Sequence, residues 1–298
     1  MSDTIDVSRV LQFKGNVLHL YQQNQAKLKG LVREESLTGK AHFFERLGKT
    51  AAVKKTTRHS DTPLVNSQHT RRMVTTVPYE WADLVDKEDK RKILFTPESE
   101  YAINGASALA RAYDYEVVYA FDSAAKSGED GSTSVAFTDE DLRDEDESGA
   151  AVTTPIIMEY KLAFDQADIP VEDRVVVSGS ALVAQLLAGS TAPLASSFDY
   201  NSVKALVGGT MDQWLGFKWV FINDADIMPL ISGDSNDKYA YFFHKNAMGI
   251  AVSADMETRV TERADKSYAL QVYLSQEMGA TRIQAGVARI RYNSNLVA

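Results

Sequence analysis

The sequence predicts an α+β fold, and three features lead to that prediction. The first is a segment of short extended pieces, Lys40 to Lys92, that contains no helix pattern of its own. The second is one long helix that follows it, and the third is a second half in which helices and buried strands alternate before a strand-rich run at Ser267–Ile283. Strands gathered in one part of a chain and alternation in another are typical of mixed folds.

The segment 40–92 is too long for an ordinary loop in a compact domain, so it is either functional or disordered. Its aromatic and β-branched residues argue against disorder. The extended pieces are expected at His42–Leu47, Ala51–Thr57 and Arg71–Val77, with a turn at Ser60–Pro63. Because an isolated two-stranded ribbon is marginal in water, we expect this projection to bury its apolar residues on another subunit.

Two helices are predicted in the first half. Apolar residues recur near helical spacing from Val7 to Leu31, with Gly30 as a stop signal. The second helix begins at Thr96-Pro97 and continues to about Ala125, a length of roughly 42 Å. Its apolar stripe comprises Ile103, Ala106, Ala110, Tyr113, Val117, Phe121 and Ala124. Gly105 is costly inside a helix, so it predicts a bend or a close backbone contact.

The second half predicts a layered α/β arrangement. Helices are expected at Thr154–Ala167, Ala181–Leu187 and Ser202–Val207, and strands at Arg174–Ser178, Lys218–Asn223, Tyr239–His244, Gly249–Val252 and Val287–Tyr292.

Charge is distributed unevenly within a net charge of -9. Residues 1–72 hold 13 Lys+Arg against 6 Asp+Glu, and the remaining residues hold 19 against 35. Opposite signs on two parts of one chain favour head-to-tail contacts between copies, and chance clustering on solvated surfaces is the alternative. A nucleic-acid-binding tail would be denser in lysine and arginine.

The composition excludes some classes of protein. There is no cysteine, which rules out disulfides and thiolate metal sites. No apolar run approaches the roughly 18 residues of a membrane span, and the first residues lack a signal-peptide core. The sequence therefore predicts a soluble protein made in the cytoplasm, with no membrane partner.

No residue pattern predicts catalysis, a cofactor or a metal. The five histidines lie apart. Ser180 is interpreted as a helix N-cap, because the G-x-S-x-G pattern of a nucleophile is missing. Asp224 and Asp226 are interpreted as capping their own loop rather than binding a metal. The interval 126–150 has nine acidic residues, but Pro155 stands where a calcium loop needs glutamate, so a solvated acidic face is expected.

The order of these elements resembles the major capsid proteins of tailed bacteriophages, which share the Hong Kong 97-like fold. PIIMEYKLAFDQADIPVEDRVVVSGSALVAQLL (Pro155–Leu187) is similar to the family's helix–strand–helix opening of the axial domain, and LGFKWVFINDADI (Leu215–Ile227) to its next core strand. The resemblance implies an N-terminal arm at 1–32, an extended hairpin (the E-loop) and its base at 33–92, a spine helix and peripheral domain at 93–149, an axial domain at 150–254, returning peripheral strands at 255–283, and a final axial strand with the C-terminus at 284–298.

The resemblance also implies a structural function without enzymatic activity. Copies would form hexamers and pentamers of an icosahedral shell around phage DNA, assembled in the host cytoplasm and located in the virion. About 30 residues precede the E-loop, which implies a separate scaffolding protein. A portal, a decoration protein and non-specific DNA contacts are the other expected partners. An α/β enzyme with a swapped dimerisation arm is the alternative.

Contacts between subunits are expected on the projection, which has eight Lys/Arg against two Asp/Glu between residues 40 and 72. The expected residues are Phe43, Phe44, Lys49, Lys54, Lys55, Arg58, Arg71 and Arg72, with Glu98, Glu100 or the interval Glu129–Glu147 as acidic partners. Some relatives crosslink an E-loop lysine to an asparagine, but no asparagine here is marked as a partner, so no crosslink is expected. Within the subunit, the long helix is expected to pack on the strands of Ser267–Ile283 through Ile103, Ala110, Tyr113, Val117 and Phe121.

Overall fold

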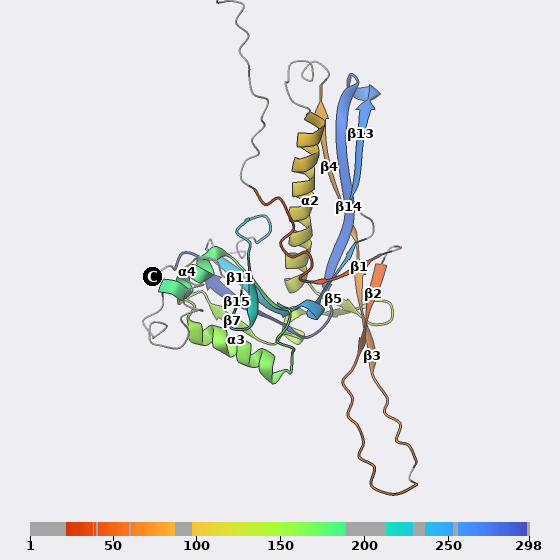
Figure 1. Cartoon of the computed structure of the whole chain (residues 1–298), viewed down its shortest axis with the longest axis vertical. Coiled ribbons are helices and arrows are strands. Elements are labelled where there is room, and N and C mark those ends of the chain that lie inside the picture. The colour runs from red at the N-terminus through yellow and green to blue at the C-terminus, as the bar shows by residue number, and fades with distance from the viewer. Residues whose placement is uncertain are drawn as a thin grey trace, which may run out of the picture. The chain divides into compact units, whose positions relative to one another are not determined.

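A computed structural model describes residues 22–37, 39, 41–59, 61–86, 97–188, 213–228, 236–252 and 256–296, without the side chains of 97–99 and 187–188. The chain divides into two compact units (Figure 1). Unit 1 comprises residues 1–25, 79–111 and 255–276, and unit 2 comprises residues 26–78, 112–254 and 277–298. Helices and strands are both present, which confirms the α+β class. In the described residues, no helix combines the length and the apolar character needed to cross a membrane.

The largest sheet of unit 2 is built on a fully buried strand. That strand, β8 (Arg174–Ser178), has the sequence RVVVS, and all five of its residues are buried. The described strands follow the order β7 (Asp144–Glu147), β15 (Val287–Asn293), β11 (Asp237–His244), β8, β10 (Phe217–Phe221) and β9 (Gln213–Trp214). β10 runs parallel to β8, whereas β11 runs antiparallel to it. A buried apolar run needs neighbours on both edges and both faces, which explains its central position.

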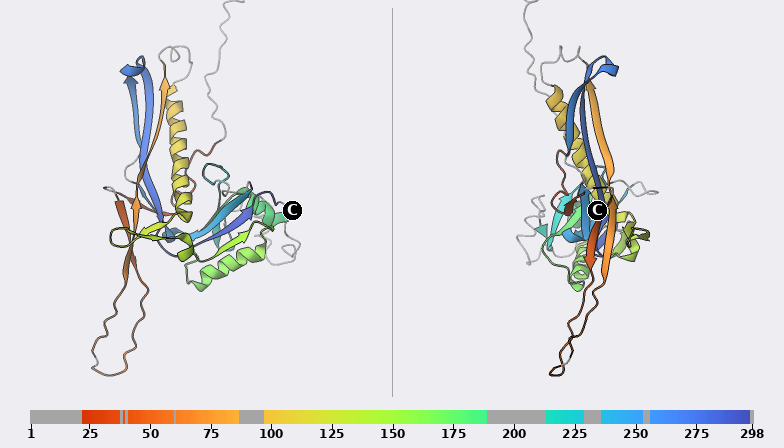
Figure 2. Two further views of the ribbon diagram at one scale, coloured as in Figure 1. Left: turned by 180° about the vertical axis from the view of Figure 1, so that it is seen from behind. Right: turned by 90° about the vertical axis from the view of Figure 1, so that its right-hand side faces the viewer.

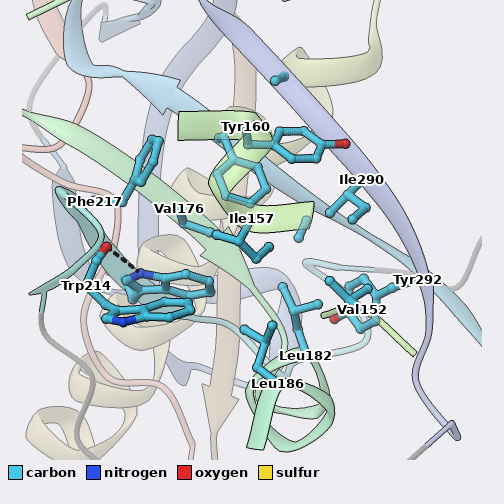
Figure 3. Packing of buried hydrophobic residues seen from close by; sticks show 14 of the residues in the cluster. Val152, Ile157, Tyr160, Val176, Leu182, Leu186, Trp214, Phe217, Ile290 and Tyr292 are labelled. Carbon is cyan, nitrogen blue, oxygen red and sulfur yellow. Dashed lines mark hydrogen bonds between the residues drawn. The ribbon is translucent and has the colours of Figure 1, made fainter. Parts of the chain in front are cut away.

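Two helices cover one face of this sheet. The first, α3 (Thr154–Gln166), follows the N-cap residue Thr153, and the second is α4 (Ser180–Ala188). Ile157, Tyr160 and Phe164 recur at helical spacing on the inner face of α3. Figure 3 shows these helices contributing to one apolar core with the strands. In that core the Tyr160 ring stacks on Phe242 with 4.6 Å between centroids.

Unit 2 also contains two smaller sets of paired strands. One has the order β2 (Ala41–Leu47), β3 (His69–Thr75), β5 (Ala125–Ser127) and β6 (Thr133–Val135). In the other, β1 (Arg33–Ser36) pairs with β12 (Met248–Val252), which pairs with the last residues of β14 (Ala269–Arg282).

Unit 1 contains the beginning of the long helix α2 (Pro97–Asp122) and the strands beside it. β13 (Glu257–Arg263) pairs with the first part of β14, and β4 (Val77–Val85) also pairs with β14. Leu109 of the helix packs with Val272 and Leu274 of β14. Figures 1 and 2 show this part of the helix alongside the strands.

Gly105 marks a close contact, as the sequence predicts. A Cβ atom on this glycine would lie 2.5 Å from Cε3 of Trp81 and 2.7 Å from Cδ1 of Leu274. We therefore expect Gly105→Ala to lower the free energy of unfolding by about 1–3 kcal/mol through overpacking, despite the higher helix propensity of alanine. Urea denaturation measures the effect. Combining it with Trp81→Leu should restore part of the loss, and a Gly105→Ala variant more stable than the wild type would contradict the contact.

Most predicted elements are confirmed within two residues of their expected ends. They are the strands at 42–47, 174–178, 218–223, 239–244, 249–252 and 287–292, the helices at 154–167 and 181–187, and the strand-rich run at 267–283. The long helix is also present, but it ends at Asp122, three residues before its expected end at Ala125. The segment 51–57 forms no strand, and most of β4 was not predicted. β13 was expected only through the family resemblance, as one of the returning strands at 255–283. Thr96 and the predicted helix at Ser202–Val207 lie outside the described residues.

The predicted helix from Val7 to Leu31 is wrong where it can be checked. Residues 22–32 form bends and turns, and the residues before them lie outside the described part of the chain. The Asp114 carboxylate of α2 accepts hydrogen bonds from the backbone amides of Lys27 at 2.8 Å and Leu28 at 3.0 Å. A buried carboxylate thus satisfies amides that a helix would otherwise pair with its own carbonyls.

The expected packing of the long helix is correct for part of its length. Ile103 is exposed, and Leu109, absent from the predicted stripe, is buried in its place. The Phe121 ring stacks on Tyr241 at 4.5 Å and lies 5.0 Å from Phe243, both on β11, whereas its backbone carbonyl accepts a hydrogen bond from Arg282 of β14. Since α2 extends from unit 1 into unit 2, its two halves belong to different cores.

Candidate assembly surfaces

The projection predicted from the sequence is a β-hairpin with a paired stem. β2 and β3 pair antiparallel from Ala41↔Thr75 to Leu47↔His69. One further hydrogen bond, from the Gly48 amide to the Gln68 carbonyl at 2.8 Å, extends the stem. Beyond it the described residues 49–68 form no strand, and Figures 1 and 2 show them as two extended lines that end in a turn. We call residues 49–68 the hairpin tip.

Apolar side chains of the hairpin tip lie in solvent. Leu64 is 94% exposed, Val53 is 59% exposed and Val65 is 46% exposed. Single exposed apolar residues are common on proteins, but three of them on a tip with no core of its own are not stabilised by the subunit that carries them. The tip therefore has the composition of a segment that packs against something else.

The cations of the hairpin tip have little to pair with in their own subunit. Lys54, Lys55 and Arg58 are exposed, and they form no ion pair with any residue that the structure describes. Lys49 lies 3.6 Å from Asp168, but both side chains are more than four-fifths exposed. An exposed pair of this kind contributes about 0–1 kcal/mol. The positive charge of the tip thus stays available to a partner.

The base of the hairpin differs from what the sequence predicts. Phe44, expected at a contact between subunits, is buried in the core of its own subunit with Leu37, Val74, Ala251 and Ile283. Arg72, expected at the same contact, is 1% exposed and pairs with Glu140. These two residues anchor the hairpin, and we do not retain them as intersubunit residues. A hairpin cation does pair with the predicted acidic interval Glu129–Glu147, but the pair, Arg72 with Glu140, lies within one chain and not between subunits.

The Glu140 carboxylate is the anion that pairs with the arginines at the base of the hairpin. It pairs with Arg72, and Arg46 of β2 lies 3.6 Å from the same carboxylate oxygen. Burial lowers the pKa of the Arg72 guanidinium, and the charge of Glu140 opposes that effect. Because a buried cation is costly without a counter-charge, Glu140 is required for the hairpin stem to pack where it does.

The other predicted hairpin residues form local contacts. The Arg71 guanidinium lies over the Phe43 ring at 5.3 Å, and its Nε is 3.7 Å from Glu45. Both Phe43 and Arg71 stay partly exposed. Of the predicted acidic partners, Glu100 is partly buried in α2, and the side chain of Glu98 lies outside the described residues.

The acidic interval is not simply a solvated face, which corrects the prediction for Asp144–Glu147. These residues form β7 and pair in parallel with β15. Arg289 donates two 2.8 Å hydrogen bonds to Asp144 and a 2.7 Å bond to Asp122. Burial alone would lower the pKa of the Arg289 guanidinium, but these hydrogen bonds outweigh burial and raise it. The acidic side chains of β7 are thus stabilised by the arginines of the neighbouring strand β15.

The structure adds no catalytic or metal site within the residues that it describes. No group of three His, Asp or Glu side chains in that part of the chain could hold a metal ion. The amide of Asp226 donates to the Asp224 carboxylate at 3.0 Å, which confirms the predicted self-capping loop. The hairpin tip is therefore the feature of the described chain that best fits a functional surface.

Several solved structures of phage capsids share this fold. The capsid structure of the cyanophage P-SCSP1u matches with a TM-score of 0.69 and 15% identity, over 98% of this chain and 95% of that chain. The capsid structure of Helicobacter pylori bacteriophage KHP30 matches with a TM-score of 0.70 and 8% identity, over 98% and 97%. The capsid of Ralstonia phage GP4 matches with a TM-score of 0.69 and 9% identity, over 96% and 95%. The fold is the Hong Kong 97-like capsid fold.

The sequence itself identifies the family. The family model described as phage capsid protein matches residues 5–294, so this chain belongs to the phage capsid protein family. No curated protein matches it. The chain is a major capsid protein with a structural, non-enzymatic role in the virion, and the alternative of an α/β enzyme with a swapped arm has no support.

Proposed function

We propose that copies of this chain form hexamers and pentamers of an icosahedral shell that encloses phage DNA, and that the hairpin tip of each copy lies on an adjacent copy. The exposed apolar and basic side chains of the tip carry this proposal. A segment that is covered in the assembly needs no core in the isolated subunit. The head-to-tail charge asymmetry of the sequence supports the same arrangement.

The energetics suit a shell that assembles from weak contacts. Each apolar side chain of the tip that becomes fully buried contributes about 1.5–3 kcal/mol. A single tip contact is therefore modest after the cost of ordering it, but each subunit engages several contacts at once and their effects combine. Weak individual contacts allow misplaced subunits to leave before the shell closes.

The proposed contact comprises the tip residues with Phe43 and Arg71 at its base. We keep Lys49, Lys54, Lys55 and Arg58 as its cations. Their proposed anionic partners on the adjacent copy are Glu98 and Glu100, together with Glu129 and Asp130, which are exposed in the turn between β5 and β6.

The proposal also includes features that rest on the family resemblance. They are the division into arm (1–32), E-loop (33–92), spine and peripheral domain (93–149 and 255–283) and axial domain (150–254 and 284–298). The same resemblance supports a separate scaffolding protein, a portal, a decoration protein, non-specific contact with packaged DNA and assembly in the host cytoplasm.

Reversing three tip charges tests the proposal. We expect Lys54→Glu, Lys55→Glu and Arg58→Glu combined to reduce shell yield strongly while the melting temperature of the dissociated subunit stays within a degree or two, because exposed charges contribute little to folding. Sedimentation and electron microscopy measure the yield. The matched control is Lys54→Arg, Lys55→Arg and Arg58→Lys, which keeps the charge and should assemble normally. Normal shells from the reversed variant would contradict the proposed contact.

A further inference from the structure

The outer face of α3 carries apolar side chains that are exposed in the described part of the subunit. Ile157, Tyr160 and Phe164 face the core, whereas Met158 is 51% exposed and Leu162 is 54% exposed. Residues four apart lie one above the other on a helix, so Met158 and Leu162 form one apolar strip. Val171, after the helix, is also exposed.

The segment that carries this strip is rich in acidic residues. Between residues 154 and 173 the chain has five acidic residues and one lysine. Glu159 pairs with Arg143, Asp165 pairs with the buried Arg174, and Asp168 lies 3.6 Å from Lys49. Asp168, Glu172 and Asp173 are nevertheless exposed. The outer face of α3 thus presents apolar side chains within an acidic rim.

We propose that this face is covered by a basic surface of a second copy of the chain, which rests on the proposed assembly and adds a second contact to it. A symmetric contact of the face with itself would place like charges opposite each other, which is unfavourable. The contact is therefore heterologous, joining two different surfaces, and contacts of that kind close into rings when the rotation between copies allows it.

Residues 27–33 of the second copy fit the acidic rim. Lys27, Lys29 and Arg33 are all exposed there, although the Lys27 ammonium donates to the Phe221 carbonyl at 2.6 Å and Arg33 pairs with Glu35 at 2.5 Å. The segment is held firmly because the Leu28 side chain is buried and the Asp114 carboxylate binds two of its amides. A fixed backbone that presents cations loses little conformational freedom on binding. The cations of the hairpin tip are already assigned to the separate contact proposed above.

Cysteine labelling tests this inference cleanly, because the chain has no cysteine of its own. Met158→Cys and Leu162→Cys are each compared in dissociated subunits and in assembled shells, with a small maleimide as the probe. We expect labelling in shells to be at least about tenfold slower, since a packed contact must open before the thiol reacts. Val176→Cys, buried in the core, is the slow reference in both states, and Leu64→Cys reports on the hairpin tip.

The outcomes separate this inference from the assembly proposal. Equal labelling rates in shells and subunits at both α3 positions would overturn it, whatever Leu64→Cys shows. A wild-type chain that forms no shells, even together with its scaffolding protein, would overturn both proposals. The basic side is tested by Lys27→Glu with Lys29→Glu, which should reduce assembly. Adding Gln166→Lys and Glu172→Lys to that variant should restore part of the lost assembly. If assembly does not recover and the α3 thiols are also labelled freely in shells, then residues 27–33 do not contact the outer face of α3.

Discussion

Truncating Phe121 to alanine is expected to lower the free energy of unfolding of the dissociated subunit by about 3–5 kcal/mol. The ring is fully buried, stacks on Tyr241 and contacts Phe243. The cavity would lie where the end of α2 packs on β11. A loss of this size is a large part of the stability of a typical domain, so insoluble or protease-sensitive protein is the expected result. Urea denaturation measures the change.

Tyr119 provides the matched control for that experiment. It lies on the same helix, two residues earlier, but is 60% exposed. Tyr119→Ala should change the free energy of unfolding by no more than about 0.5 kcal/mol. Equal losses from Phe121→Ala and Tyr119→Ala would show that the end of α2 does not pack on β11 as described.

Replacing Glu140 by alanine is the second change with a large expected effect. It leaves Arg72 buried without its anion and removes the charge that Arg46 also approaches. Breaking a buried ion pair costs about 3–5 kcal/mol, and since the Glu140 side chain is partly exposed we expect the lower end of that range. Chemical denaturation measures the loss, and hydrogen exchange should show faster opening of β2 and β3.

A double variant separates the lost pair from a general packing defect. Because an apolar side chain of similar length leaves no buried charge, Arg72→Met added to Glu140→Ala should recover most of the stability. If the double variant were as unstable as Glu140→Ala alone, the buried arginine would not be the cause of the loss.

Truncation of Phe44 is expected to affect folding, and truncation of a residue of the hairpin tip is expected to affect assembly. The sequence placed Phe43 and Phe44 together on a contact between subunits, but alternate residues of a strand point to opposite faces. Phe44 consequently enters the subunit core and Phe43 does not. Truncation of Phe44 should therefore reduce stability, whereas truncation of Leu64 on the tip should reduce assembly alone.

Local patterns predicted most of the regular structure correctly. β8 was predictable because RVVVS is a short apolar run, and α2 because its start signals and its apolar period agree. The segment before β1 was not predictable in this way, because Asp114, far away in the sequence, determines its backbone. The acidic strand β7 was missed for a similar reason, since its acidic residues are stabilised by Arg289 and Arg291 of β15.

The functional surface was predicted in its location and partly in its residues. Composition and length indicated that residues 40–92 contain a projection, and the structure shows the hairpin there. Composition could not separate the anchoring residues of the base from those of the tip, because that distinction depends on which side chains find partners after folding. Arg72 and Lys54 are both cations in the sequence, yet of the two only Arg72 meets an anion among the residues that the structure describes.

Electron cryomicroscopy of shells formed by the full chain, with its scaffolding protein where that is needed, tests the central claim most directly. The account predicts closed shells of hexamers and pentamers in which density for residues 49–68 lies on an adjacent subunit, with Leu64 and Val65 covered. Shells in which the hairpin tip contacts only solvent or its own subunit would contradict it.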